Sequence, residues 1–559
     1  MADGNRNPFV NVSWSSAITC IYLALPFPLT ALDQTRDYHE RTELCGGPLY
    51  TCSRDKDNLQ ARNFSPNINI SKNPFPQNEP SVKISRKNSS RLVAAWRDFR
   101  TGITPAIRRV GYSYSTDGGS TWAPGALLPP YDAMHPRASD PSVAVDLDGN
   151  FYIGTISLDE QNLDGKVFIY KSTNEGVSFD TATVASPLQG GGEDRDFLAC
   201  DLCVSSPYSN ALYVAWTRIH PSGGIILSKS NNGGLLWSNP VQVSEDTSLG
   251  VGGAALATGT RGELYAVWVG AHGVFFDKST DGGQSFGKDV LVSDTVKSGT
   301  GWPSIAVDLT SGTSSGTLYV VWEDERNGDS DIFLVRSNNG GDSWSSPARV
   351  NGDVVKNGTK QFLPSIAVDD SGRISIIFYS NADNLDSTYV RAYLTQSNDG
   401  GRTFSDQPVG TESFRPYAPN SAIRYGDYIG IDSWAGILVP VWMDQRAGGV
   451  DQEIYTAAVS HGTEEPDTSE VPVVFTLPQN YPNPFSGKTV VEIHLPAPGF
   501  VTLKVFDILG REVTTLIKEE LSRGIHRRIW NAEDLRAGIY FYRLEANGFA
   551  TTNKAAMVR

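Results

Sequence analysis

The pattern Trp-x-Asp-x-Arg occurs three times in the chain, and each copy ends a run of apolar residues. The copies are Trp96/Asp98/Arg100, Trp322/Asp324/Arg326 and Trp442/Asp444/Arg446. A guanidinium group binds a carboxylate in bidentate fashion, so three such groups on one face of the molecule would clamp a substrate carboxylate. In the alternative interpretation, each Asp pairs with the Arg of its own loop. The recurrence of the pattern favours this local role.

Carboxyl and phenol groups gather in further segments that precede apolar runs. The residues are Glu193, Asp194 and Arg195 in one segment, Glu79 and Asp140 directly before Pro-Ser dipeptides, and Tyr425, Asp427 and Tyr428 in a last segment. Such groups can transfer protons or bind a polar ligand. The alternative is that they tie neighbouring segments of the fold together.

Metal and redox chemistry have weaker signals. The acidic loop Asp324–Asp331 offers oxygen ligands that suit calcium, but it lacks the spacing of an EF-hand, so calcium is an open alternative to an expectation of no metal and no cofactor. Cys200 and Cys203 form a lone C-x-x-C, which predicts two semi-buried thiols. Cys45 and Cys52 bracket a short loop and could pair in an oxidising compartment.

One octapeptide recurs six times and sets the architecture. Its pattern is Ser-x-Asp/Asn-x-Gly-x-Ser/Thr-Trp/Phe, with one departure at Leu236. An Asp or Asn side chain can bond the backbone of its own turn, and Gly supplies positive φ, so each copy predicts a hairpin turn. The side chains expected to brace these turns, in a structural role, are Asp117, Asn174, Asn232, Asp281, Asn339 and Asp399.

The segments around these octapeptides, or boxes, predict four-stranded antiparallel sheets. Such sheets repeated around a centre form a β-propeller. Six repeats carry boxes, and Tyr428–Val459 supplies three strands without one. The strand pattern Asn67–Ser71 supplies the missing fourth strand. Residues 63–460 are therefore expected to form an all-β propeller of seven blades, closed by an N-terminal strand, with six blades as the alternative. The loops that follow each second strand and the connections between blades share the face opposite the boxes, where we expect a binding site.

The boxes resemble the Asp-box (BNR) repeats of the sialidase superfamily, over about residues 63–460. The resemblance implies a secreted glycoside hydrolase that acts on extracellular or cell-surface glycans. It implies a tyrosine nucleophile (Tyr425 or Tyr428) with Glu193 or Asp194, Asp140 as general acid, and Arg100, Arg326, Arg446 and Arg195 as carboxylate-binding groups. Sialidases resemble six-bladed propellers and carry an Arg-Ile-Pro motif, which this chain lacks. A non-catalytic propeller that binds glycans or proteins therefore stays open as the second function.

The chain end has a different character. After a polar linker at 461–472, residues 473–559 contain Tyr481–Phe485 (YPNPF), Phe506–Arg511 (FDILGR) and Ala537–Tyr542 (AGIYFY). These pieces strongly resemble the C-terminal sorting domain of type IX secretion cargo. The resemblance implies recognition by the type IX machinery and a location outside a Gram-negative cell. The alternation of apolar and polar residues predicts a small β-sandwich.

Composition agrees with a secreted β protein and excludes one class of partner. The chain has 559 residues and a net charge of −15, and a nucleic-acid binder should lean basic. No apolar run is long enough to cross a membrane. Residues 1–31 fit a signal peptide, with an irregular segment at 32–62, and we expect a monomer.

Overall fold

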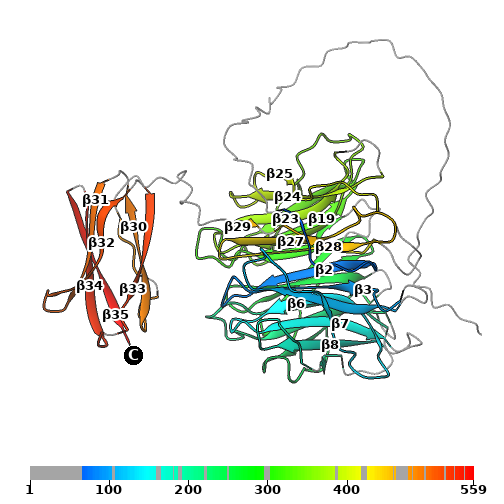
Figure 1. Cartoon of the computed structure of the whole chain (residues 1–559), viewed down its shortest axis with the longest axis horizontal. Helices are drawn as coiled ribbons and strands as arrows, with labels where there is room; N and C mark the ends of the chain where they lie inside the picture. Colours follow the sequence, from blue (N-terminus) through cyan, green and yellow to red (C-terminus); the bar gives the residue numbers. More distant parts are fainter. Residues whose placement is uncertain are drawn as a thin grey trace, which may run out of the picture. The chain divides into compact units, whose positions relative to one another are not determined.

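The structure is a computed structural model. It describes residues 66–558 except 103–106, 159–164, 181, 187–191, 220–222, 248–250, 295–301, 384–387, 417–424, 458, 461–475, 481, 496–498, 522–523, 534 and 547. Within these residues, every helix or strand assigned is a β-strand (Figure 1). The all-β prediction is therefore confirmed. The expected signal peptide, the segment 32–62, Cys45, Cys52 and the linker 461–472 lie outside the described residues.

The described residues between 68 and 460 form seven antiparallel sheets, each built mainly from four strands. In chain order the sheets contain β2 (Gln77–Ile84), β3 (Leu92–Asp98), β4 (Arg109–Ser115) and β5 (Ala126–Leu127); β6 (Arg137–Val145), β7 (Phe151–Leu158), β8 (Gly165–Ser172) and β9 (Thr183–Val184); β10 (Glu193–Cys200), β11 (Leu212–Arg218), β12 (Gly224–Ser230) and β13 (Val241–Gln242); β14 (Gly252–Thr258), β15 (Leu264–Gly270), β16 (Gly273–Ser279) and β17 (Val290–Asp294); β18 (Ser304–Val307), β19 (Leu318–Asp324), β20 (Asp331–Ser337) and β21 (Ala348–Arg349); β22 (Gln361–Val368), β23 (Ile374–Ser380), β24 (Arg391–Ser397) and β25 (Ser405–Pro408); and β26 (Gly430–Trp434), β27 (Ile437–Asp444), β28 (Glu453–Thr456), β29 (Val459–Ser460) and β1 (Ile68–Asn69).

The first strands of the sheets surround a common centre. Strands β2, β6, β10, β14, β18, β22 and β26 each contact the next, and β26 contacts β2. Residues of all seven strands line one central cavity of about 220 Å³. The arrangement is that of a β-propeller-like ring of sheets.

The second strand of each sheet explains the long apolar runs of the sequence. Strand β3 is buried along its whole length, and so are β11 and β23. A strand whose two faces are both covered needs apolar residues on both faces, which replaces the usual alternation by a continuous run. Trp96, Trp216 and Trp322 at the ends of such runs are at most 1% exposed.

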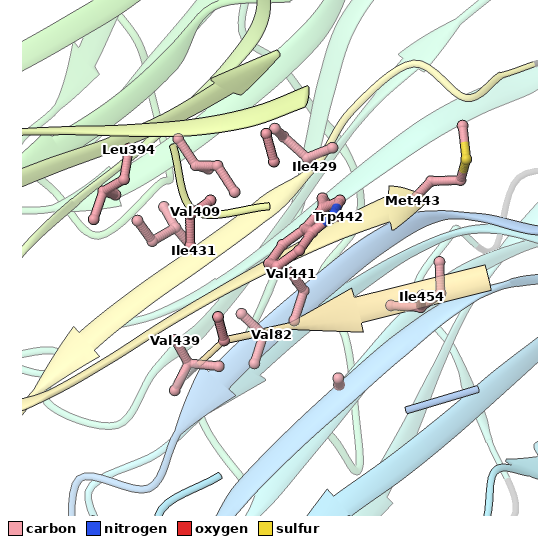
Figure 2. Packing of buried hydrophobic residues seen from close by; sticks show 14 of the residues in the cluster. Val82, Leu394, Val409, Ile429, Ile431, Val439, Val441, Trp442, Met443 and Ile454 are labelled. Atoms are coloured by element: carbon pink, nitrogen blue, oxygen red, sulfur yellow. The ribbon is translucent and has the colours of Figure 1, made fainter. Parts of the chain in front are cut away.

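The last sheet of the ring includes the N-terminal strand β1. Ile68 of β1 pairs with Thr456 of β28 in antiparallel register. Figure 2 shows the apolar cluster at this junction, in which Val82 of β2 lies near Val439 and Val441 of β27. The last sheet is therefore built from both ends of the ring's own sequence.

A buried ion pair joins the same two sheets. Two nitrogens of the Arg86 guanidinium donate to the two carboxylate oxygens of Asp432, each at 3.0 Å. The Ile84 N–H also donates to Asp432. Burial opposes ionisation of Asp432, but the charges of Arg86 and Lys83 outweigh it and hold the pKa of this carboxyl below its usual value.

The six octapeptides make one set of hydrogen bonds. In the first, the Gly119 N–H donates to Ser115 Oγ at 2.9 Å, and the Thr121 N–H donates to Asp117 Oδ1 at 2.8 Å. The other five repeat both bonds. A Lys or Arg side chain just before a box often donates a hydrogen bond to a backbone carbonyl of the next box. Lys229 Nζ, for example, donates to the Gly282 carbonyl at 2.9 Å. The boxes thus brace turns and join sheets.

The C-terminal part, described by itself, has two antiparallel sheets. One contains β30 (Lys488–Leu495) and β33 (Gly524–Asn531); the other contains β32 (Glu512–Leu521), β31 (Gly499–Asp507), β34 (Gly538–Ala546) and β35 (Phe549–Met557). Both contribute to one apolar core that includes Phe485, Val505 and Trp530. Strand β34 alternates buried and exposed residues, because only one of its faces meets this core.

Replacing Asp432 by Asn should destabilise the ring, since Arg86 would stay buried without its counter-charge. We expect a loss of about 3 kcal/mol, seen as a lower midpoint of thermal unfolding. Asp342→Asn in the exposed pair with Lys278 is the matched control, with a change below about 1 kcal/mol. An unchanged midpoint for Asp432→Asn would contradict this account of the closure.

Candidate functional site

Five of the first strands carry a β-bulge at the same position. Each bulge contains a residue with positive φ, namely Glu79 (55°), Asp140 (55°), Arg195 (47°), Gly253 (68°) and Leu363 (53°). Bulges re-aim side chains, and non-Gly residues in the left-handed region store strain of about 1–3 kcal/mol each. In the remaining two sheets, Trp302 before Pro303-Ser304 and Tyr428 before Ile429-Gly430 hold the corresponding sequence positions. We call these seven residues the mouth ring.

Glu79 is 1% exposed and is tied to the second strand of its own sheet. Arg97 donates to Glu79 Oε1 at 2.7 Å through a terminal nitrogen and to Asn78 Oδ1 at 2.7 Å through Nε. Burial raises the pKa of Glu79 well above its usual value, and the charges of Asp140 and Asp427 add to this, although Arg97 opposes it. Glu79 is therefore a buried carboxyl beside a fixed cation.

Asp140 and Asp194 form a carboxyl pair with opposite pKa shifts. Burial, then the charge of Asp140 and a hydrogen bond to it, raise the pKa of Asp194 to about 7. Asp140 is half-buried; desolvation opposes its ionisation, but Arg97, a hydrogen bond from Ser139 and Arg108 lower its pKa. Of the two carboxyls, Asp194 therefore holds its proton more tightly than Asp140.

Arg195 lies between two aromatic rings. Its Cζ is 4.8 Å from the ring centroid of Trp302 and 4.8 Å from that of Tyr428. Both distances suit cation–π contact. Arg195 Nη1 and Trp302 Nε1 are buried atoms without a hydrogen-bond partner in the described part of the chain, and both residues line the central cavity. Buried donors are nearly always paired in folded proteins, so this is a place where a ligand would gain hydrogen bonds.

The two candidate tyrosines have different surroundings. Tyr428 donates its hydroxyl to the Pro141 carbonyl at 3.1 Å, and burial, with the charges of Glu79 and Asp140, raises its pKa well above the usual value. Tyr425 packs instead against the rings of Phe362, Tyr379 and Phe414 at 5.2–6.4 Å. Only Tyr428 belongs to the cluster with Asp140, Asp194 and Arg195.

The three Trp-x-Asp-x-Arg arginines occupy three separate hydrogen-bond networks. Arg100, Arg326 and Arg446 each bind the Asp of their own loop at 2.6–2.7 Å, and each also binds a nearby fourth strand or its flank. The Trp of each motif donates to the same Asp. Each arginine is thus bonded within its own loop, which is the local role that the recurrence of the pattern favours over a shared carboxylate clamp. The short i, i+2 spacing is what favours the local bond.

Glu193 is likewise part of a local contact. The Arg218 guanidinium at the end of β11 donates to Glu193 Oε1 at 3.0 Å, across the pair of strands β10 and β11. The side chains of Glu193 and Asp194 point to opposite faces because residues alternate along a strand. Of these two carboxyls, Asp194 is thus the one that lies with Asp140, Arg195 and Tyr428.

Two carboxylates of the acidic loop considered for calcium are bound by cationic or amide side chains. Asp324 binds Arg326, and Asp331 accepts from Arg349 Nε at 2.6 Å and from Asn351 at 2.8 Å. In the described ranges, no group of three His, Cys, Asp or Glu side chains is placed to hold a metal ion. Cys200 is buried and Cys203 half-buried, and neither forms a disulfide.

Several residues of the site did not stand out in the sequence. Arg97 is the first x of the first Trp-x-Asp-x-Arg copy, and Arg108 directly precedes β4 outside any motif; both act on Asp140. Trp302 was hidden inside a Pro-Ser pattern. Trp302 could have been recognised because it directly precedes a Pro-Ser dipeptide, as Glu79 and Asp140 do.

Comparison with known families decides the nature of the chain end. Residues 479–558 match the family described as the secretion system C-terminal sorting domain. The C-terminal part is a type IX sorting domain. The sorting domain covers a minor part of the chain and places the protein among cargo exported to the cell surface or beyond.

Part of the chain is also similar to solved structures. One is a protein of unknown function from Dyadobacter fermentans (TM-score 0.41, 14% identity, covering 58% of this chain and 96% of that one). Another is the NanB sialidase from Streptococcus pneumoniae (0.40, 13%, 57% and 67%). A third is a PL25 ulvan lyase (0.42, 10%, 71% and 96%). No curated protein matches the chain.

In the part of the chain that the structure describes, no helix has the length and apolarity needed to span a bilayer.

The proton held by Asp194 predicts a pH-dependent stability. The unfolded chain ionises this carboxyl near pH 4, whereas the folded chain keeps its proton to about pH 7. Because the folded state binds the extra proton, the contribution of Asp194 to stability falls as pH rises through this window.

We therefore expect Asp194→Asn to gain thermal stability relative to the parent protein between about pH 4 and pH 7, with a constant difference above. Unfolding midpoints at pH 4 to 8 measure this difference. Asp342→Asn serves as the control for removing a surface carboxylate. A pH-independent difference for Asp194→Asn would refute the assignment.

Proposed function

We propose that the chain is a secreted seven-bladed β-propeller that binds an extracellular or cell-surface glycan at the mouth ring. The sorting domain supports export. The seven sheets in cyclic contact support the blade count. The observation that carries the binding role is Arg195, held between Trp302 and Tyr428 with buried donor atoms that lack partners.

Sugar chemistry fits this arrangement. A pyranose presents an apolar ring face, which stacks on aromatic side chains, and many hydroxyl groups, which accept and donate hydrogen bonds. The mouth offers the donors Arg195 Nη1 and Trp302 Nε1 and the carboxyl groups of Asp140 and Asp194 as acceptors or donors, while the rings of Trp302 and Tyr428 cover the guanidinium. A mixed set of this kind suits a polar ring-shaped ligand.

A second candidate function is glycoside hydrolysis at the same mouth. The observation that favours it is the pair Asp140 and Asp194, because carboxyls with separated pKa values can divide the roles of base and acid. Asp194 would protonate the leaving oxygen, and Asp140 would activate water or orient Tyr428. Two features weigh against it: the pair shares a hydrogen bond, whereas glycosidase carboxyls are about 5–9.5 Å apart, and Tyr428 donates to a backbone carbonyl.

Arg195→Ala should remove ligand binding while leaving the fold intact. Hydrogen bonds to a charged group contribute about 1.5–3 kcal/mol, so we expect about ten- to hundredfold weaker binding on an array of neutral, carboxylated and sulfated glycans. Arg261→Ala, which removes an exposed guanidinium, is the matched control. Equal binding by Arg195→Ala and the parent protein would refute the proposed site.

A panel of fluorogenic glycosides separates the two candidate functions. The binding role predicts no turnover of any substrate by the parent protein. Turnover that disappears in Asp194→Asn would instead select the hydrolase and overturn the non-catalytic proposal.

Removal of residues 473–559 should block export. The remaining ring keeps its own core, because the sorting domain has a separate apolar cluster, so the truncated protein should fold yet stay inside the cell envelope. Fractionation of the culture, with detection of the ring by antibody, measures this. Equal amounts of the full and truncated proteins in the medium would contradict the assigned role of the domain.

A further inference from the structure

One position of the mouth ring has no side chain. Gly253 occupies the bulge of β14 where Glu79, Asp140, Arg195 and Leu363 stand in other sheets. Those four residues have φ values of 47–55°, so this bulge tolerates side chains in the left-handed region. Positive φ therefore does not by itself explain why residue 253 is glycine.

The indole of Trp302 explains it. A Cβ built on Gly253 would overlap the six-membered ring of Trp302, and one built on Gly252 would touch the same ring at 3.5 Å. Trp302 thus lies flat against the bulge of the neighbouring sheet. The Gly253 N–H donates to Thr217 Oγ1 at 3.2 Å, which holds the bulge itself in place.

From this position Trp302 reaches across the fourth sheet to the third. Its ring stacks on the guanidinium of Arg195, whose other face is covered by Tyr428. Among the described residues, Nη1 of Arg195 is buried without a hydrogen-bond partner. The two rings therefore pack on this guanidinium at the cavity, where the charges of Asp427 and Asp140 also act on it.

We infer that Gly253 and Trp302 are positioning residues: the missing side chain at 253 lets the Trp302 ring cross one sheet and hold Arg195 in the orientation that receives the ligand. The part of this inference that concerns ligand rests on the proposed function. The part that concerns the orientation of Arg195 does not.

The arginine reagent phenylglyoxal tests the orientation without any ligand. In the full-length protein, Arg195 should react slowly because both faces of its guanidinium are covered. Gly253→Ala displaces the Trp302 ring and Trp302→Ala removes it, so both variants should raise the rate of Arg195 modification severalfold, as followed by peptide mass spectrometry. Gly448→Ala is the matched control, since Gly448 also has positive φ (80°) and no atom lies within 4 Å of an added Cβ.

The midpoint of thermal unfolding shows whether each variant is still folded. Gly253→Ala should cost stability, and the double variant Gly253→Ala/Trp302→Ala should cost less than the sum of the two single variants, because the overlap is gone. An additive result, or an unchanged rate of Arg195 modification in both single variants, overturns the inference.

Glycan-array binding by the same variants tests whether the orientation of Arg195 affects ligand binding. Faster modification of Arg195 together with weaker binding supports both. Faster modification with unchanged binding overturns the ligand-orienting role of Trp302. If the parent protein binds no glycan on the array, the proposed function fails, while the modification rates still decide whether Gly253 and Trp302 position Arg195.

Discussion

Each sheet of the ring has two apolar faces and can bury both only by lying between two other sheets. This requirement fixes the sequence of the second strands, where β3, β11 and β23 are buried throughout. It also demands that the row of sheets close on itself, because an open row would expose two large apolar faces to water. The closure combines apolar packing around Val82 and Val439 with the buried pair Arg86–Asp432.

The same closure creates the candidate site. Once seven first strands face one centre, their bulges direct residues from different sheets to a common mouth. Charge is concentrated there in a partly desolvated space, and this explains why Asp140 and Asp194 titrate so differently although they share a hydrogen bond. A site made in this way takes residues from several sheets, so its chemistry can change by substitution without altering the sheets.

The sequence predicted the parts of the fold that depend on local and repeated patterns. Boxes, apolar second strands and the closing strand near Ile68 all follow from turn chemistry and hydrogen-bonding patterns that each repeat carries on its own. The candidate site was predicted only in part. Asp140, Asp194, Arg195 and Tyr428 do meet.

The rest of the site depends on geometry that a sequence does not display. Arg100 is two residues from Asp98 and binds its carboxylate. Arg97, the residue before Asp98, points to the opposite face of the strand because side chains alternate, and it binds Glu79. Trp302 contributes to a site two sheets away only because Gly253 leaves the path open. Such effects arise from distances between sheets, not from spacing along the chain.

The pairing of β1 with β28 also has a consequence for how the chain folds. Ser71 Oγ accepts a hydrogen bond from the N–H of Ile454, and these residues are 383 positions apart. The first strand made must therefore wait, unpaired, until nearly the whole ring has emerged, and contacts of such long range form slowly because the intervening chain must first be ordered. Until then the row of sheets keeps exposed apolar ends that favour aggregation. The protein is thus most vulnerable late in its assembly, when all but the last sheet is complete.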